Sequence, residues 1–116
     1  MLSDEDLAAF RAQLERQLEE LAAQDAATAE SRRPVELDQQ STGRLTRMDA
    51  LQQQAMAKAT EQRRRVAAGR IRAALKRLDE DEYGDCVRCG EEIPIARLRL
   101  DPATAVCVPC LENEGG

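Results

Sequence analysis

Four cysteines in the C-terminal third constrain the fold of this chain more than any other feature. They form two CxxC pairs, separated by 17 residues: Cys86-Val87-Arg88-Cys89 and Cys107-Val108-Pro109-Cys110. Two residues between thiols let one tight turn direct both sulfurs at one ion, and Gly90 permits the positive φ that such turns often need. This spacing lies within the window for a tetrahedral zinc site. We therefore predict that one Zn²⁺ is bound by Cys86, Cys89, Cys107 and Cys110.

The role expected for this zinc is structural. A closed four-thiolate site leaves no position for water, so the metal would fold the module without catalysing a reaction. An iron–sulfur cluster also takes four thiolates, but the symmetric spacing of the two pairs favours zinc. A redox CxxC is disfavoured because the chain lacks the strands of a thioredoxin-like fold. With no histidine in the sequence, no other ligand set competes.

The first of two long helices is predicted over about residues 3–31. Aromatic residues make up only 2% of the 116 residues and charged residues 34%, so a thin helical seam is expected in place of a thick core. Ser3 and Asp6 form a capping-box-like start. One apolar stripe follows, with spacings of three and four residues: Leu7, Phe10, Leu14, Leu18 and Leu21.

The second helix is predicted over about residues 44–83, from the turn-forming Ser41-Thr42-Gly43 to Gly84. Its expected apolar positions are Leu45, Met48, Leu51, Ala55, Ala59, Val66, Ala73, Leu75 and Leu78. Because neither helix can bury its stripe alone, we expect a long antiparallel two-helix coiled-coil hairpin over residues 1–83. It would project roughly 40 Å, with its tip at about residues 34–46. The zinc module would follow at 84–116, which makes the fold class mostly α.

Charge is strongly segregated along the chain. Residues 44–78 hold ten basic and two acidic residues, whereas both flanking segments are acidic and the net charge is −5. The first partner expected for this basic strip is the acidic segment beside it. No apolar run approaches the ~20 residues needed to cross a bilayer, and acidic residues open the N-terminus where a signal peptide carries basic ones. We therefore expect a cytoplasmic protein.

A longer pattern surrounds the cysteines. An acidic run from Asp79 to Glu82 is followed by Tyr83-Gly84, the CxxC-Gly knuckle, Ile93, Ile95, Arg97-Leu98, Pro102 and the second CxxC. This pattern resembles the DksA/TraR family of C4-type zinc-finger transcription regulators. The resemblance implies a non-enzymatic protein that binds bacterial RNA polymerase and modulates initiation, with its hairpin inserted into the secondary channel. We expect a monomer without sequence-specific DNA binding, in keeping with its acidic balance.

The hairpin tip departs from the family pattern. The family's tip motif is Asp-x-x-Asp-x-Ala, and the nearest match here, Asp38 to Gly43, keeps only the first aspartate. Counting back from the first cysteine without gaps instead places the tip near Thr46 to Met48. The candidate partner-binding residues at the tip are therefore Asp38, Ser41, Arg44 and Asp49.

Cooperation with guanosine tetraphosphate is also put in question by two positions. Family members that act with this nucleotide resemble one another in a basic residue just before the finger's proline and another just after the last cysteine. Those positions hold Asp101 and Leu111 here. An anionic ligand would meet Asp101 unfavourably, which leaves Arg70 on the second helix as a remaining basic candidate.

Two other classes of function stay open at this point. A small zinc-containing adaptor for another protein would be favoured by self-association through the stripe from Leu7 to Leu21. A nucleic-acid-binding zinc ribbon would use the basic strip, but the chain lacks aromatic stacking residues. An enzyme is not expected, because the sequence offers no histidine, no open metal site and no recognisable nucleophile with a base.

Overall fold

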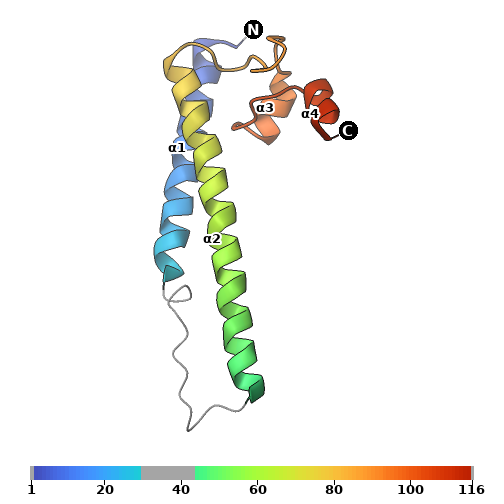
Figure 1. Ribbon diagram of the computed structural model, residues 1–116. Coiled ribbons are helices and arrows are strands. Elements are labelled where there is room, and N and C mark those ends of the chain that lie inside the picture. The colour runs from blue at the N-terminus through green and yellow to red at the C-terminus, as the bar shows by residue number, and fades with distance from the viewer. Residues whose placement is uncertain (1, 30–43, 116) are drawn as a thin grey trace. The chain divides into compact units, whose positions relative to one another are not determined.

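The computed structural model describes residues 2–29 and 44–115, and these form four helices (Figure 1). The helices are α1 (Asp4–Ala27), α2 (Arg44–Asp79), α3 (Ile95–Leu100) and α4 (Val108–Gly115). The extended pairing found in this part of the chain is an isolated antiparallel bridge between Asp85 and Glu92. The mostly α fold with two long helices is therefore confirmed. Among these described residues, no helix has the length and apolar character of a membrane span.

Helix α1 begins with the predicted capping box. The Ser3 hydroxyl accepts a hydrogen bond from the Asp6 amide, the Ser3 amide donates to the Asp6 carboxylate, and both distances are 3.1 Å. The bond from the Ser3 amide is the largest contribution that lowers the pKa of the Asp6 carboxyl below its ordinary value. The helix ends at Ala27, four residues before the predicted limit, where the Thr28 hydroxyl donates to the Gln24 carbonyl oxygen at 2.9 Å. Such side-chain bonds to the backbone compete with continuation of a helix.

Helix α2 ends at Asp79, also four residues before the predicted limit. Asp81 takes a left-handed conformation with φ 58°, and the Glu82 amide donates to the Arg77 carbonyl oxygen at 2.8 Å. This is the Schellman arrangement, which satisfies a carbonyl at the end of a helix. Gly84, with φ 98°, serves the next turn instead, where a Cβ would lie 2.9 Å from the Cδ1 of Leu2.

Two compact units divide the described chain. The first unit contains residues 1–19 and 68–116, and the second contains residues 20–67. In each unit, segments of α1 and α2 are antiparallel neighbours. The Arg11 guanidinium donates to Asp79 at 2.8 Å in the first unit, and the Arg64 guanidinium donates to the Thr28 hydroxyl at 2.7 Å in the second. The first unit thus extends across the expected domain boundary between residues 83 and 84.

The hydrophobic core lies in the first unit. Phe10 and Leu14 of α1 are 5% and 0% exposed, which confirms the centre of the predicted stripe, and Leu7 and Leu18 are half-buried beside them. The Phe10 ring lies 5.6 Å from the Tyr83 ring. Buried side chains of α2 and of the C-terminal module complete this core: Ala68, Ile71, Ala74, Leu78, Ile93, Leu98 and Ala103.

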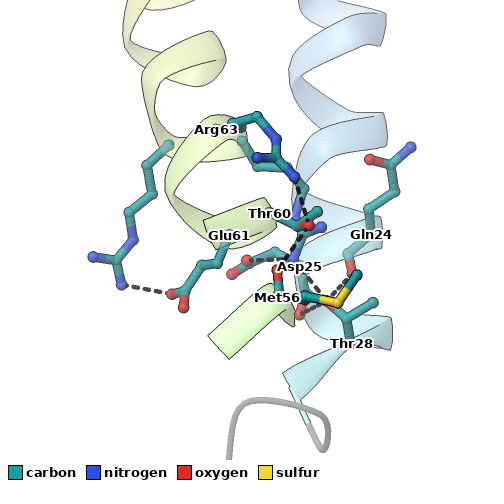
Figure 2. Close-up of polar contacts among 9 residues, drawn as sticks. Gln24, Asp25, Thr28, Met56, Thr60, Glu61 and Arg63 are labelled. Atoms are coloured by element: carbon teal, nitrogen blue, oxygen red, sulfur yellow. Dashed lines mark hydrogen bonds and ion pairs between the residues drawn. The ribbon is translucent and has the colours of Figure 1, made fainter. Parts of the chain in front are cut away.

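The second unit pairs α1 and α2 through polar groups. The Arg64 side chain is only 12% exposed and lies 3.5 Å from the Asp25 carboxylate, which adds an ion pair to its bond with Thr28. Figure 2 shows further bonds of this region, including those of the Thr28 hydroxyl to the α1 backbone. Among residues 20–29 and 47–67, no side chain is fully buried. This unit therefore has little apolar burial of its own.

The predicted apolar stripe of the second helix is wrong over most of its length. In the second unit five of the predicted positions are exposed: Met48, Leu51, Ala55, Ala59 and Val66. In the first unit Ala73 is exposed, Leu75 is half-buried and Leu78 is buried. The half-buried α2 residues of the second unit lie on a different face and include Gln54, Ala57, Glu61 and Arg64.

Tyr83 carries a buried hydrogen bond that can be followed by titration. Its hydroxyl donates to the Pro102 carbonyl oxygen at 2.7 Å, and burial raises the pKa of Tyr83 to about 12. Because the folded-state pKa is raised, this group stabilises the fold fully below its ordinary pKa of 10.0, and the stabilisation is lost as pH rises towards 12.

We expect alkaline titration of the native protein, followed by tyrosine absorbance, to give a midpoint about two pH units above that of the unfolded chain. Tyr83 is the single tyrosine and tryptophan is absent, so the signal belongs to one residue. The matched control is the same titration in concentrated denaturant. A native midpoint equal to that control would show that the buried bond does not form.

Candidate metal centre

The first cysteine pair sits on a tight backbone turn. The Cys86 amide donates to the Glu91 carbonyl oxygen at 2.8 Å, and the Gly90 amide donates back to the Cys86 carbonyl oxygen at 2.9 Å. Gly90 has φ 78°, as its predicted role in the knuckle requires. Ile93 donates from its amide to the Gly84 carbonyl oxygen at 2.8 Å, which closes the ends of this loop.

The second pair is placed by a helix start. Cys107 directly precedes α4 and Cys110 lies in its first turn, where the Leu111 amide donates to the Cys107 carbonyl oxygen at 3.0 Å. The two knuckles are joined by a bond from the Val87 amide to the Ala105 carbonyl oxygen at 2.9 Å. Backbone hydrogen bonds therefore bring residues far apart in sequence to one site.

The four sulfurs converge on one point. All four Sγ atoms lie within 4.8 Å of one another, and those of Cys89 and Cys107 are 3.6 Å apart. A tetrahedron with metal-to-sulfur distances of ~2.3 Å has edges of ~3.8 Å, so the arrangement fits a tetrahedral ion. Cys86 and Cys107 are only 3% and 7% exposed. The predicted set of cysteines is thus positioned to bind one metal ion.

The thiols of this cluster differ in acidity. Hydrogen bonds, the largest from the Cys89 backbone, lower the pKa of Cys86 to about 6. Interaction with the Cys107 thiol raises the pKa of Cys110 to about 12. Sulfurs this close cannot all ionise without a cation, and a dication such as Zn²⁺ stabilises the thiolate form of each ligand. Metal binding at this site is therefore accompanied by proton release and weakens at low pH.

Two side chains to which the sequence assigned no structural role, Arg97 and Thr104, support the segment before Cys107. The Arg97 guanidinium donates to the Val106 carbonyl oxygen at 3.2 Å, and the Thr104 hydroxyl donates to the same oxygen at 3.3 Å. Thr104 is 4% exposed, and its carbonyl oxygen accepts a hydrogen bond from Arg77 at 3.4 Å. Arg97 was part of the recognised pattern, but no local signal distinguished Thr104 from a surface threonine.

Arg70 and Asp101, which the sequence raised separately, form an ion pair. Their side chains approach to 2.7 Å and are about half exposed. Such surface pairs contribute little to stability. Here the pair places the Arg70 charge beside a carboxylate, where it is a weaker site for an anion than a lone arginine would be.

A cleft of about 640 Å³ also lies in the first unit. Its lining combines apolar side chains, among them Leu7, Tyr83 and Ile93, with the carboxylates of Asp4, Asp81, Asp85 and Glu92. This negative lining disfavours an anionic nucleotide, as Asp101 does.

The tip candidates are only partly within the described chain. Asp38 and Ser41 lie outside the described residues. Arg44 is the first residue of α2, and Asp49 is an exposed residue in its second turn. Both belong to the second unit, whereas the metal centre belongs to the first.

Comparison with known proteins shows that the segment containing the four cysteines matches a protein-family model. Residues 81–113 match the prokaryotic dksA/traR C4-type zinc finger. The chain is 46% identical over 48 residues to the RNA polymerase-binding transcription factor DksA of Haemophilus influenzae, a match that covers 41% of this chain and 33% of that protein. The protein of the same name from Escherichia coli is 35% identical over 48 residues, covering 41% of this chain and 32% of the relative. The matched region thus spans about a third of the length of these curated relatives.

A solved structure extends the likeness beyond the finger. The transcription factor DksA2 from Pseudomonas aeruginosa has a TM-score of 0.78 and 25% sequence identity, covering 97% of this chain and 85% of that one. The similarity therefore includes both long helices as well as the cysteine module.

Proposed function

We propose that this chain, whose residues 81–113 match the prokaryotic dksA/traR C4-type zinc finger, is a transcription regulator of the DksA/TraR family that binds RNA polymerase directly. The observation that carries the proposal is the likeness of nearly the whole chain to the DksA2 structure. Two relatives that share the finger are named for binding RNA polymerase. They are named as transcription factors, and the function proposed here is likewise not catalytic.

The zinc is proposed to be a structural part of the regulator. Cys86, Cys89, Cys107 and Cys110 would hold it in a closed four-thiolate site, which leaves no open coordination position for chemistry. The ion would stabilise the fold of the first unit, in which the finger shares a core with the ends of both long helices. Function would then depend on zinc through folding alone.

The long helices are proposed to enter the secondary channel of the polymerase and thereby change initiation, in the cytoplasm where the polymerase works. This finer mechanism is supported by the family resemblance and by the antiparallel contacts of α1 and α2, such as Arg64 with Thr28. Asp38, Ser41, Arg44 and Asp49 remain the proposed contact residues at the tip. We propose that the protein acts as a monomer and needs no sequence-specific DNA binding of its own.

Guanosine tetraphosphate is not expected to be required. Asp101 replaces the basic residue expected before the finger's proline, and it also pairs with Arg70 at 2.7 Å. The carboxylates that line the cleft of the first unit add further negative charge. An anionic nucleotide therefore meets repulsion at the positions where a cofactor would need attraction.

The purified zinc-loaded protein is expected to bind core RNA polymerase in the absence of DNA. The measurement is fluorescence anisotropy of the labelled chain titrated with core polymerase, followed by competition with an established secondary-channel factor. Failure to bind would overturn the proposed function. Binding without competition would overturn insertion into the channel and leave direct binding in place.

The same preparation allows the tip and the nucleotide to be tested by transcription in vitro. Asp38→Asn and Asp49→Asn each remove one carboxylate with little change in shape. We expect the variant that lies at the tip to keep polymerase affinity but lose the effect on initiation. Addition of guanosine tetraphosphate is expected to leave the wild-type effect unchanged, and a strong enhancement would contradict that expectation.

A further inference from the structure

An exposed apolar stripe runs along α2 in the second unit. It consists of Met48, Leu51, Ala55, Ala59 and Val66, which we call the outer stripe. At about 3.6 residues per turn these positions share one face of the helix. Met48, Leu51 and Val66 are 59%, 46% and 56% exposed. The larger side chains, Met48, Leu51 and Val66, are therefore held in water near the two ends of the stripe, with Ala55, Ala59 and the polar Gln62 between them.

Packing between α1 and α2 does not explain the outer stripe. The α2 residues of this unit that approach α1 lie on a different face and include Arg64, which contacts Asp25 at 3.5 Å and Thr28 at 2.7 Å. The half-buried Gln54 and Glu61 lie on that same face. The segment thus places polar groups where a hairpin usually places apolar ones and leaves its larger apolar groups outside.

This arrangement is typical of a surface that binds another protein. Single exposed apolar residues are ordinary, but several of them on one face of a helix mark an interaction site. Spacings of three, four and seven residues are those of a helix that lies in an apolar groove. Methionine adapts its shape to such grooves, and the small Ala55 and Ala59 allow close approach of a partner.

Charge indicates the chemistry of the partner. Residues 47–67 contain five basic and two acidic residues. Lys58 and Arg63 are exposed and flank the outer stripe on opposite sides by their helical positions. Arg63 donates to the Thr60 hydroxyl at 2.9 Å, which leaves its positive charge uncompensated in that contact (Figure 2). A complementary surface has an apolar centre and an acidic rim.

Nucleic acid fits this surface less well than protein does. Binding of single strands relies on aromatic side chains that stack on bases, and the outer stripe is aliphatic. Binding of duplex phosphates would use the basic residues but would gain nothing from the apolar row between them.

We infer that the outer stripe is a docking surface of this chain and that it binds an acidic, apolar-centred surface of RNA polymerase. The inference rests on the proposed function for the identity of the partner. It adds the face of the helix that makes contact and the chemistry of the surface it meets.

The first test removes the apolar groups. Leu51→Ser combined with Val66→Ser is expected to weaken binding to core polymerase by at least about tenfold, since buried apolar anchors dominate interface energies. The matched control replaces Val87 and Leu100 by serine. These two apolar residues belong to the first unit, and their exposed fractions are 60% and 88%. That control is expected to bind as the wild type does. Far-UV circular dichroism of both variants checks that helix content is kept.

The second test changes only charge. Its result therefore does not depend on whether the first double variant folds. Lys58→Glu with Arg63→Glu keeps helix propensity and the apolar row. Weaker binding by about tenfold at low salt, with a smaller difference at high salt, is expected for charges that flank an interface.

The outcomes separate the inference from the proposed function. If the wild type binds polymerase and both double variants bind equally well, the outer stripe is not the docking surface, although the proposed function stands. If the wild type does not bind at all, both are overturned. The same proteins are also titrated with duplex DNA. If the wild type binds DNA and both double variants lose that binding, the surface belongs to nucleic acid and the inference is overturned.

Discussion

Replacement of Cys107 by serine is expected to abolish zinc binding and unfold the C-terminal module. Cys107 is 7% exposed, and its Sγ lies 3.6 Å from that of Cys89, so one lost thiolate opens the whole ligand set. Structural zinc binding in small fingers contributes on the order of 10–16 kcal/mol of apparent free energy, which is as large as the whole ~5–15 kcal/mol net stability of a typical domain. This is the largest single effect expected for this chain.

Metal analysis and circular dichroism together check this expectation. We expect about one zinc per wild-type chain and almost none for Cys107→Ser, with helix content reduced in the variant. Val87→Ser is the control, because its side chain lies in the first knuckle but is 60% exposed and is not a ligand. A serine variant that keeps both its zinc and its native helix content would refute a four-thiolate site.

Phe10→Ala is expected to lower the free energy of unfolding by about 3–5 kcal/mol, the usual cost of removing a buried aromatic ring. Phe10 is 5% exposed and packs at 5.6 Å from the Tyr83 ring, so the substitution leaves a cavity between the N-terminal helix and the finger side of the first unit. Such an aromatic pair contributes ~0.5–1.5 kcal/mol of stability beyond the contribution of the apolar area that it buries.

Urea unfolding of zinc-loaded protein, followed by circular dichroism, measures this loss. Leu100→Ala is the matched control, since Leu100 is 88% exposed, and a change within ~0.5 kcal/mol is expected. If Phe10→Ala cost no more than the control, the core described for the first unit would be wrong.

Features specified by neighbouring residues could be predicted from the sequence. The spacing of the cysteines determined the ligand set, because two residues between thiols allow one turn to direct both at an ion. Gly90 was recognised because the turn needs a positive φ, and the structure gives it 78°. The capping box of Ser3 and Asp6 involves groups three residues apart, so it too could be predicted.

The two long helices end among hydrogen bonds that the periodic spacing of apolar residues does not reveal. The predicted limit of α2 rested on Gly84 as the stop signal, but the left-handed Asp81 and the bond from the Glu82 amide to the Arg77 carbonyl oxygen close the helix at Asp79. At the end of α1 the Thr28 hydroxyl donates to the Gln24 carbonyl oxygen, a bond that apolar spacing does not predict. Both boundaries therefore differed from the prediction by four residues.

The sequence by itself determined the cysteine set positioned for a metal ion, the starts of the two long helices and the buried face of α1. The buried face of α2 was decided only in the tertiary structure, because this helix carries apolar residues on more than one face and a periodic pattern cannot tell which of them meets α1. In the second unit, the face of α2 that meets α1 carries Arg64, which contacts Asp25 of α1 and Thr28 directly after it. The apolar row from Met48 to Val66 is consequently left outside, where another protein can bind it.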